Sequence, residues 1–164
     1  MAQVRAQDIM TRDVKTVRAD APLREAAELF TTHGISGAPV VDETGNVVGM
    51  VSESDLINPE KRRAALPRMA VFGVYVVPEE TLQRAYQEGM SLPTREVMSR
   101  NVLSAAEDTP ADELARRMVA SRINRVPILR DNKPVGIVTR EDILRGLMTF
   151  PGAAPVAEDR RASA

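Results

Sequence analysis

The sequence contains no cysteine, no tryptophan and a single histidine, and aromatic residues make up only 3% of its 164 residues. Without cysteine the chain forms no disulfide and has no thiol nucleophile. With a single histidine as well, it cannot assemble a structural zinc site of the usual Cys/His type. Because aromatic side chains are scarce, aliphatic residues and methionine must build the core.

An excess of charge of one sign and long apolar runs are also lacking. Lys and Arg number 22 against 23 Asp and Glu, which gives a formal net charge of -1, and the isoelectric point is about 5.9. The sequence therefore has no general attraction for nucleic acid or an anionic membrane, and no nucleic-acid partner is expected.

The longest apolar run, Met69 to Val77, is too short to span a bilayer as a helix. The first ten residues are polar and lack the apolar core of a signal peptide. We expect a cytoplasmic globular protein, either one domain or two small halves sharing a core.

The most informative feature that is present is an internal repeat. Residues 8–57 align with residues 96–144 when a one-residue gap is placed in the turn at residues 45–46. Two copies of one supersecondary unit, neither expected to bury its apolar face alone, predict a pseudo-symmetric pair with clefts between the copies. This organisation favours a binding module over an enzyme. The positions that coincide include Met10 with Met98, Gly49 with Gly136, Ser52 with Thr139, and Asp55 with Asp142.

Each copy predicts the same order of elements, β-α-β-β-α. The first helix has apolar residues at i, i+3, i+4 and i+7, the stripe of an amphipathic helix. It opens at Pro22 or Pro110 and is expected to end near Gly34 or around Arg122. We therefore expect an α/β (α+β) fold of two repeats packed through their sheets. The predicted strands are 14–17, 38–41 and 47–51 in the first copy and 102–105, 126–129 and 135–138 in the second, and the last helices begin at Ser52 and Thr139.

The predicted domain organisation has four parts: a first repeat over 1–57, a linker over 58–94, a second repeat over 95–150 and a tail over 151–164. The linker contains the apolar run and a predicted helix from Pro78 to Glu88, closed by Gly89. We expect the apolar run to pack on the repeats rather than form a dedicated partner site. The tail is rich in small residues and proline, and is expected to be disordered.

A Ser/Thr-x-x-Asp motif recurs where the last strand of each copy becomes a helix, as Ser52 with Asp55 and Thr139 with Asp142. Backbone N–H groups are unpaired at such a junction, and a hydroxyl there can cap the helix or contact a phosphate. The carboxylate can accept hydrogen bonds from two vicinal ribose hydroxyls. The same motif is also a capping arrangement with an acidic residue in the first turn. Recurrence does not decide between these readings, because a cap would recur too.

A longer pattern comprises the Asp-Ile-Met-Thr opening at 8–11, residues 35–42 (Ile-Ser-Gly-Ala-Pro-Val-Val-Asp), the Val-Gly-Met-Val-Ser stretch at 48–52 and Asp55. It returns at 123–128, 135–139 and Asp142. Taken together, these stretches resemble the CBS domain. The resemblance implies a tandem CBS pair, or Bateman module. Such modules bind adenosyl ligands (AMP, ADP, ATP or S-adenosylmethionine) in clefts between the copies. They commonly form homodimers, and they regulate rather than catalyse.

The resemblance also implies which residues form two clefts, each drawing on both copies. In each cleft apolar residues flank the adenine, backbone groups of the loop before the strand read its edge, the aspartate holds the ribose, and the hydroxyl and nearby cations meet phosphate. The first cleft combines Thr139 and Asp142 with Asp13, Val14, Lys15, Ile35, Ser36 and Gly37, and the second combines Ser52 and Asp55 with Asn101, Val102, Leu103, Ile123, Asn124 and Arg125.

The cations differ between the clefts. Lys15 and Arg140 are the candidates for phosphate in the first, and Arg122 or Arg125 in the second. Each of them can equally be a solvated surface charge. His33, near the first cleft, is more typical of a favourable partner for the helix dipole than of a phosphate ligand. The differences between Lys15 and Leu103, and between Gly34 and Arg122, predict two unequal clefts.

Three functions are weighed, and nucleic-acid binding by the arginine-bearing surface is a further possibility that the isoelectric point disfavours. The favoured one is a ligand-sensing module that signals to an unidentified protein partner through the geometry of a homodimer. The alternative is a protein interaction or oligomerisation module without a small-molecule ligand, in which the two aspartates are only caps. An enzyme is disfavoured because the sequence has no Ser/His/Asp order, Cys/His pair, metal cluster or P-loop. No catalytic residue, metal or resident cofactor is therefore assigned.

Overall fold

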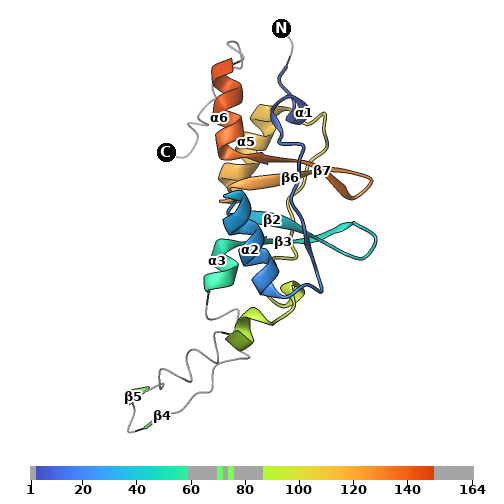
Figure 1. The fold of residues 1–164 in the computed structure, drawn as a ribbon. Helices are drawn as coiled ribbons and strands as arrows, with labels where there is room; N and C mark the ends of the chain where they lie inside the picture. Colours follow the sequence, from blue (N-terminus) through green and yellow to red (C-terminus); the bar gives the residue numbers. More distant parts are fainter. Residues whose placement is uncertain (1–2, 59–69, 72–73, 76–86, 150–164) are drawn as a thin grey trace. The chain divides into compact units, whose positions relative to one another are not determined.

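The computed structural model describes residues 3–58, 70–71, 74–75 and 87–149 (Figure 1). The chain forms two compact units. The first, called here the discontinuous unit, joins Met1–Val14 to Leu103–Ala164, and the second, the continuous unit, is Lys15–Val102. Each copy of the sequence repeat supplies the bulk of one unit.

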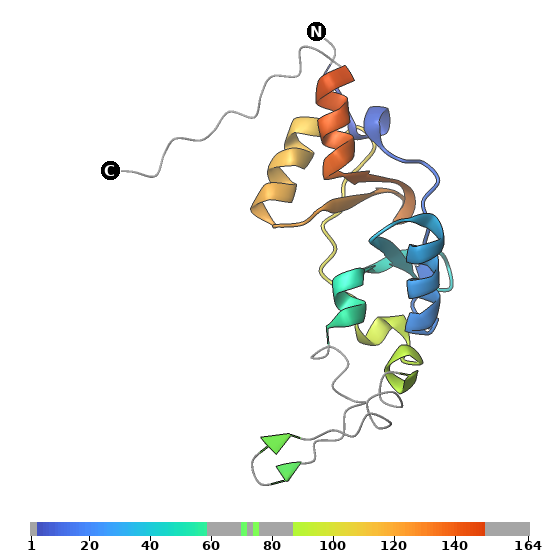
Figure 2. The same cartoon turned by 60° about the vertical axis from the view of Figure 1, so that its left-hand side comes forward.

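The continuous unit contains the first copy. Strand β1 runs parallel to β2, and β2 pairs antiparallel with β3, so the sheet order is β1-β2-β3. Helices α2 and α3 contact each other, and Figure 2 shows them together with this sheet. The elements are β1 (Val17–Arg18), α2 (Leu23–His33), β2 (Gly37–Val41), β3 (Val47–Ser52), α3 (Glu53–Ile57), β4 (Ala70–Val71), β5 (Val74–Tyr75) and the 3-10 helix η2 (Thr94–Glu96).

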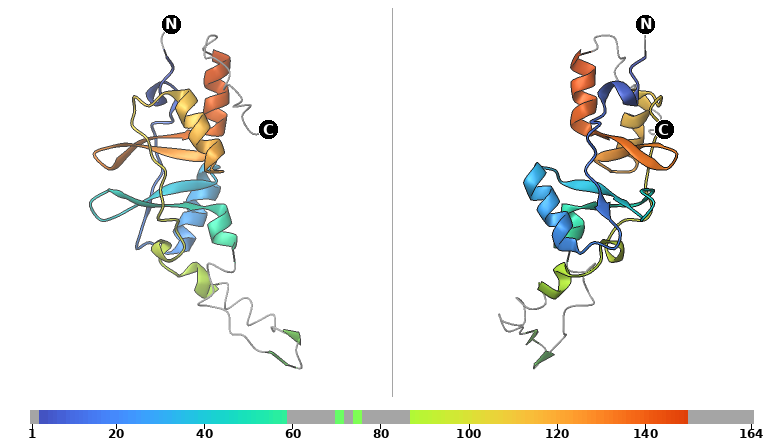
Figure 3. Two further views of the ribbon diagram at one scale, coloured as in Figure 1. Left: turned by 180° about the vertical axis from the view of Figure 1, so that it is seen from behind. Right: turned by 45° about the vertical axis from the view of Figure 1, so that its right-hand side comes forward.

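The discontinuous unit contains the second copy. Strands β6 and β7 form an antiparallel hairpin, and α6 contacts both α5 and β7 (Figure 3). The elements are α1 (Ala6–Ile9), α5 (Ala111–Ala120), β6 (Arg125–Arg130), β7 (Lys133–Thr139) and α6 (Arg140–Thr149).

The predicted first strand of each copy is the element that differs most from expectation. In the first copy it lies at Val17–Arg18, at the end of the predicted 14–17 segment. In the second copy it is reduced to a single parallel bridge between Ala105 and Ile128. The other predicted elements are present in both copies, so the order β-α-β-β-α holds apart from this short first strand.

The amphipathic helices end as their sequences predict. The apolar stripe is buried at Leu23 and Phe30 on α2 and at Leu114 and Met118 on α5. After each helix one residue is left-handed, Gly34 with φ 61° and Arg122 with φ 53°. The next N–H donates back to the helix in both copies, from Ile35 to the Phe30 carbonyl at 3.1 Å and from Ile123 to the Met118 carbonyl at 3.0 Å. This bond is the mark of a Schellman end.

The opening segment of each copy packs on the other copy. In the discontinuous unit the Ala6 N–H donates to the Thr109 carbonyl at 2.8 Å, and in the continuous unit the Thr94 N–H donates to the Ala21 carbonyl at the same distance. These bonds are equivalent in the repeat alignment. Each unit therefore has its own core, which the opening segment of the other copy completes. Both cores are aliphatic; among their described buried residues, Phe30 alone is aromatic.

The linker is described in part. Residues 87–90 are helical and Gly89 lies inside this turn, so the prediction that Gly89 closes the helix is wrong, and the helix continues to Met90. The earlier part of that predicted helix and the 151–164 tail lie outside the described residues. Of the apolar run, β4 and β5 are described, and they pair with each other in antiparallel fashion. None of the helices in the described part of the chain combines the length and hydrophobicity needed to cross a membrane.

Candidate functional site

In the continuous unit, a buried carboxylate marks the point where strand β3 becomes helix α3. Ser52 is the last residue of β3, and Asp55, only 7% exposed, lies in the first turn of α3. One oxygen of Asp55, Oδ2, accepts from the Ser52 N–H at 2.8 Å and from the Ser52 hydroxyl at 2.9 Å. The Ser52 hydroxyl also lies 2.8 Å from the Ser54 hydroxyl. The two residues form the reciprocal bonds of a capping box.

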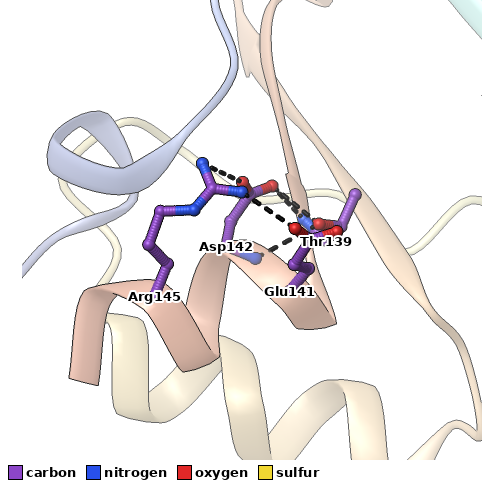
Figure 4. Close-up of polar contacts among 4 residues, drawn as sticks. All are labelled: Thr139, Glu141, Asp142 and Arg145. Carbon is purple, nitrogen blue, oxygen red and sulfur yellow. Dashed lines mark hydrogen bonds and ion pairs between the residues drawn. The ribbon is translucent and has the colours of Figure 1, made fainter. Parts of the chain in front are cut away.

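The discontinuous unit repeats this geometry at the junction of β7 and α6 (Figure 4). Asp142 is 5% exposed. Its Oδ2 accepts from the Thr139 N–H and from the Thr139 hydroxyl, both at 2.8 Å. The Asp142 N–H donates to the Thr139 hydroxyl at 3.3 Å. A carboxylate has four lone-pair positions on two oxygens, so Oδ1 retains capacity to accept from other donors.

Each junction lies beside the loop that precedes the first hairpin strand of its own copy. The Glu53 N–H donates to the Ser36 carbonyl, and the Arg140 N–H donates to the Asn124 carbonyl, both at 3.1 Å. In the ladders, Gly37 pairs with Ser52 and Arg125 pairs with Thr139. The predicted adenine-reading loop and the predicted ribose carboxylate of one copy are therefore neighbours within one unit.

The opening segment of the other copy reaches the same strand. Met50 on β3 exchanges two backbone bonds with Ser99, at 2.9 and 2.8 Å, and Ile137 on β7 does the same with Thr11, at 3.0 and 2.9 Å. Asn101 and Val102 follow Ser99 in the chain, and Asp13 and Val14 follow Thr11. Each unit thus combines a junction with candidate site residues that the sequence assigns to the other copy.

The candidate site residues divide between the units as follows. Both predicted clefts need residues from each unit, so their composition stays a prediction. The continuous unit contains Lys15, Ile35, Ser36, Gly37, Ser52, Asp55, Asn101 and Val102, and the discontinuous unit contains Asp13, Val14, Leu103, Arg122, Ile123, Asn124, Arg125, Thr139, Arg140 and Asp142.

The candidate phosphate-binding cations have different surroundings. Arg140 is exposed, and its Nε donates to the Ile123 carbonyl at 3.2 Å, which ties the guanidinium to the loop of its own copy. Arg122 is exposed at the left-handed end of α5. Lys15 and Arg125 are half-buried. His33 is exposed in the last turn of α2, the position expected of a dipole partner.

Sequence reasoning did not single out two residues beside Asp142. Arg145 Nη1 lies 3.7 Å from Asp142 Oδ1, and Arg145 Nη2 lies 3.2 Å from Glu141 Oε1. The sequence signal for them is the i, i+3 and i, i+4 spacing of opposite charges on a helix. Such pairs are common on exposed helix faces, so this spacing alone does not mark a site residue.

The arrangement is suited to binding hydroxyl donors rather than a metal ion. The described residues contain no group of three or more His, Cys, Asp or Glu side chains that could hold a metal. Each junction instead presents one well-oriented carboxylate. Such a carboxylate can accept from a neutral polyol without assistance from a second acid.

The fold and its junctions define a tandem α/β repeat protein with one oriented carboxylate in each repeat. Residues 6–59 and residues 95–149 each match the CBS domain family. The chain belongs to this family and carries two of its repeats. The family assignment and the mixed α/β fold class expected from the sequence are thereby confirmed.

Known proteins with this organisation are similar over most of their length. Protein MJ1426 of Methanocaldococcus jannaschii is 30% identical over 154 residues, covering 87% of this chain and 90% of the relative. The CBS domain of a CBS domain containing membrane protein from Sphaerobacter thermophilus is 32% identical, with a TM-score of 0.67 and 87% coverage of both chains. The CBS domain pair of protein MJ0100, solved in complex with 5'-methylthioadenosine and S-adenosyl-L-methionine, is 28% identical, with a TM-score of 0.66, and the match covers 90% of this chain and 98% of that one.

Other curated relatives are much longer than the matched region. The chain spans 25% of the inosine-5'-monophosphate dehydrogenase and 22% of the L-aspartate semialdehyde sulfurtransferase of M. jannaschii. The matched part corresponds to a module of those enzymes. Their activities are therefore not transferred to this chain.

Proposed function

We propose that this protein is a regulatory module that binds an adenosyl ligand through its two Ser/Thr-x-x-Asp junctions. The observation that carries the proposal is the pair of nearly buried carboxylates, Asp55 and Asp142, each fixed through Oδ2 by the strand-end residue. A carboxylate oriented in this way can accept ribose hydroxyls without reorganisation. Support comes from the 28% identical CBS pair of MJ0100, whose two bound ligands both contain an adenosine ribose.

In this proposal each cleft draws on both copies. The apolar residues Val14 and Ile35, or Val102 and Ile123, flank the adenine. The backbone of the neighbouring loop reads the edge of the base, and the hydroxyl of Ser52 or Thr139 and the nearby cations serve a phosphate. Lys15 in one cleft against Leu103 in the other makes the two sites unequal. The four candidate ligands, AMP, ADP, ATP and S-adenosylmethionine, differ in charge. Which of them each cleft prefers therefore depends on the cations that the cleft contains.

The ligand acts by its different affinity for two arrangements of a homodimer, and the change passes to a separate protein partner in the cytoplasm. The exposed apolar side chains Val119 on α5 and Leu144 and Met148 on α6, which are 72%, 62% and 85% exposed, support a protein-contacting face on the discontinuous unit. The regulatory role is also why we assign no catalytic step to this chain. Turnover of bound ATP by the purified protein would contradict this assignment.

The test is a thermal-shift and calorimetric series with AMP, ADP, ATP and S-adenosylmethionine. A ligand that binds only the folded state raises the melting temperature with its concentration. We expect Asp55→Ala and Asp142→Ala each to remove one binding event and the double variant to remove both. Thr44→Ala, a loss of an exposed hydroxyl in the β2–β3 turn, serves as the control and should bind as the wild type does. The absence of a shift with all four ligands would overturn the proposal.

A second candidate function is favoured by the capping boxes themselves. Both aspartates satisfy backbone N–H groups at the start of a helix, which is sufficient reason for their presence. On this reading the chain is a protein interaction or oligomerisation module without a small-molecule ligand. The same aspartate variants discriminate between the two, because they would then lower the free energy of unfolding by about 1 kcal/mol while no adenosyl ligand binds the wild type.

A further inference from the structure

The two carboxylate junctions differ in the length of the helix that follows. Helix α3 ends at Ile57, and Asn58 already has an extended backbone. Helix α6 continues to Thr149. Three residues beyond the aspartate, the first copy therefore has Asn58 at a helix end, whereas the second has Arg145 inside a helix. The longer helix directs a guanidinium toward Asp142.

Arg145 approaches the oxygen of Asp142 that the capping box does not use. Oδ2 of Asp142 accepts twice from Thr139, whereas Oδ1 lies 3.7 Å from Arg145 Nη1. The second branch of the guanidinium donates to Glu141 Oε1 at 3.2 Å. Figure 4 shows Arg145 extended across both acidic side chains. The guanidinium is thus placed between two carboxylates, next to Oδ1.

The corresponding positions of the continuous unit carry no charge. Glu141 corresponds to Ser54, and Arg145 corresponds to Asn58. Ser54 lies close to the Ser52 hydroxyl, at 2.8 Å. The two positions that place an anion and a cation beside Asp142 are therefore occupied by neutral residues in the first copy.

We propose that Arg145 is a specificity-determining residue that competes with a ribose hydroxyl for Asp142 Oδ1. A ligand must displace the guanidinium from this oxygen before the ribose can bind. Arg145 therefore lowers the affinity of the Asp142 site for the ribose. This inference rests on the proposed function, because it assumes that the aspartates receive an adenosyl ribose.

The size of the effect follows from the exposure of the pair. The Arg145 side chain is 65% exposed and the Asp142 side chain only 6%. An ion pair with one exposed partner contributes modestly, so removing Arg145 should strengthen binding about fivefold. Because the cation is exposed, its competition should also be screened by salt. A purely structural role for Arg145 would not produce this salt dependence.

The experiment uses 5'-methylthioadenosine, which carries no phosphate, so that loss of a cation does not change its attraction to the site. In an Asp55→Ala background only the Asp142 site remains. Calorimetry then compares the dissociation constant of this variant with that of the Asp55→Ala/Arg145→Asn double variant, in which position 145 has the residue of the first copy. Arg116→Asn is the matched control. It removes the same charge from another exposed helical pair, with Asp112 at 2.9 Å, in the same unit. Circular dichroism and urea unfolding verify that the variants fold.

We expect Arg145→Asn to strengthen binding about fivefold and Arg116→Asn to leave it unchanged. Raising the salt concentration from about 0.05 to about 0.5 M shortens the Debye length about threefold. It should therefore strengthen binding to the Asp55→Ala variant but not to its Arg145→Asn derivative. If Asp55→Ala does not fold, the comparison is made in the wild-type background, where Arg145→Asn should strengthen one of the two binding events and leave the other unchanged. Equal or weaker binding after Arg145→Asn overturns the inference. Absence of binding for every adenosyl ligand in the wild type and all variants rejects the proposed function as well.

Discussion

At the scale of single residues, two glycines on the strands leading to the junctions are covered by methionines. A Cβ on Gly49 would lie 2.9 Å from Met98 Cγ and 3.1 Å from the Ser99 carbonyl oxygen, and a Cβ on Gly136 would lie 2.8 Å from Met10 Cγ. The methionine of each opening motif therefore packs flat against a glycine of the other copy. This contact explains why methionine and glycine both recur in the repeat.

We predict that Gly49→Ala lowers the free energy of unfolding by about 1–3 kcal/mol, because the methyl group overlaps Met98 and cannot be accommodated without a shift. Urea unfolding measures the change. Adding Met98→Ala should recover part of the loss, so that the double variant is less destabilised than the sum of the two single variants. Additive effects would show that Met98 and Gly49 do not share this contact. Gly136→Ala with Met10→Ala is the equivalent pair in the other unit.

The repeat made the candidate carboxylates predictable, but not their surroundings. Ser52 with Asp55 and Thr139 with Asp142 were found because the same residue types recur at the same place. The sequence also predicted that the two aspartates can cap a helix, and the hydrogen bonds that their Oδ2 atoms accept agree with this prediction. The position of Arg145 next to Oδ1 could not be predicted, because spacing on a helix does not decide how a long side chain divides its contacts between two nearby acids.

At the scale of elements, the hairpins of the two copies share a ladder irregularity but differ in their turns. The register shifts between Val40 and Val41 in one hairpin and at the equivalent place, between Ile128 and Leu129, in the other. The β2–β3 turn is held by Asp42, whose Oδ1 accepts from the Thr44 hydroxyl at 2.7 Å, the Thr44 N–H at 2.9 Å and the Asn46 N–H at 3.0 Å. The hydrogen bond from the Thr44 hydroxyl and then those from the backbone hold the pKa of Asp42 below its ordinary value. The β6–β7 turn uses two left-handed residues instead, Asp131 and Asn132, at φ 50° and 62°.

A pH-dependent contribution of Asp42 to stability follows. Because its folded-state pKa is lowered, the stabilisation is present above the ordinary value of 3.8 and is lost as the pH falls through that value and below it. We predict that Asp42→Ala destabilises the protein at pH 7 and that the difference from the wild type shrinks between about pH 4 and pH 2. Urea unfolding across this range measures it. A difference that is independent of pH would contradict the role of the ionised carboxylate.

The left-handed ends of α2 and α5 provide a second test at this scale. Both helices need a positive φ at the equivalent position, which glycine adopts freely and arginine does not. We predict that Gly34→Ala lowers the free energy of unfolding by about 1 kcal/mol and that Arg122→Gly raises it by about 0.5 kcal/mol. Arg122→Ala removes the same charge without relieving the backbone, and so should give no gain. If Arg122→Gly destabilises the protein instead, its side chain makes contacts that outweigh the backbone strain.

Element prediction succeeded where a pattern was long. The stripes of α2 and α5 and the apolar hairpin strands each contain enough positions to define a period. The first strand was displaced in one copy and reduced to one bridge in the other, because two residues carry no periodic signal. Gly89 was expected to end a helix, but glycine is tolerated within a helical turn when neighbouring residues supply the packing.

At the scale of the whole molecule, the compact units do not coincide with the sequence repeats. The continuous unit includes residues 87–102, which precede or open the second copy. The discontinuous unit includes residues up to Val14, which open the first copy. Aligning the two copies shows which residues are equivalent. It does not show which segment each residue packs against, so the alignment could not reveal that the copies exchange their opening segments. The bonds from Ala6 to Thr109 and from Thr94 to Ala21 establish it within each unit.

We predict that a fragment comprising residues 15–102 folds alone, whereas the first sequence repeat, residues 1–57, does not. The longer fragment retains the Ser99–Met50 bridge and the Met98 side chain that complete its core, and the repeat lacks both. Cooperative urea unfolding and dispersed amide resonances are the measurements. A cooperatively folded 1–57 fragment beside an unfolded 15–102 fragment would show that the sequence repeat is the true folding unit.

The exchange of opening segments also sets an order of events during translation. Residues up to Val14 leave the ribosome before the hairpin and helices that they pack against. At about 5–20 residues per second, this earlier segment waits roughly 5–30 seconds for its partners. Residues 15–102 are complete well before then and can fold while the remainder is being made. During this time the nascent chain therefore carries residues up to Val14 without their packing partners, and residues 103–149 then complete the discontinuous unit.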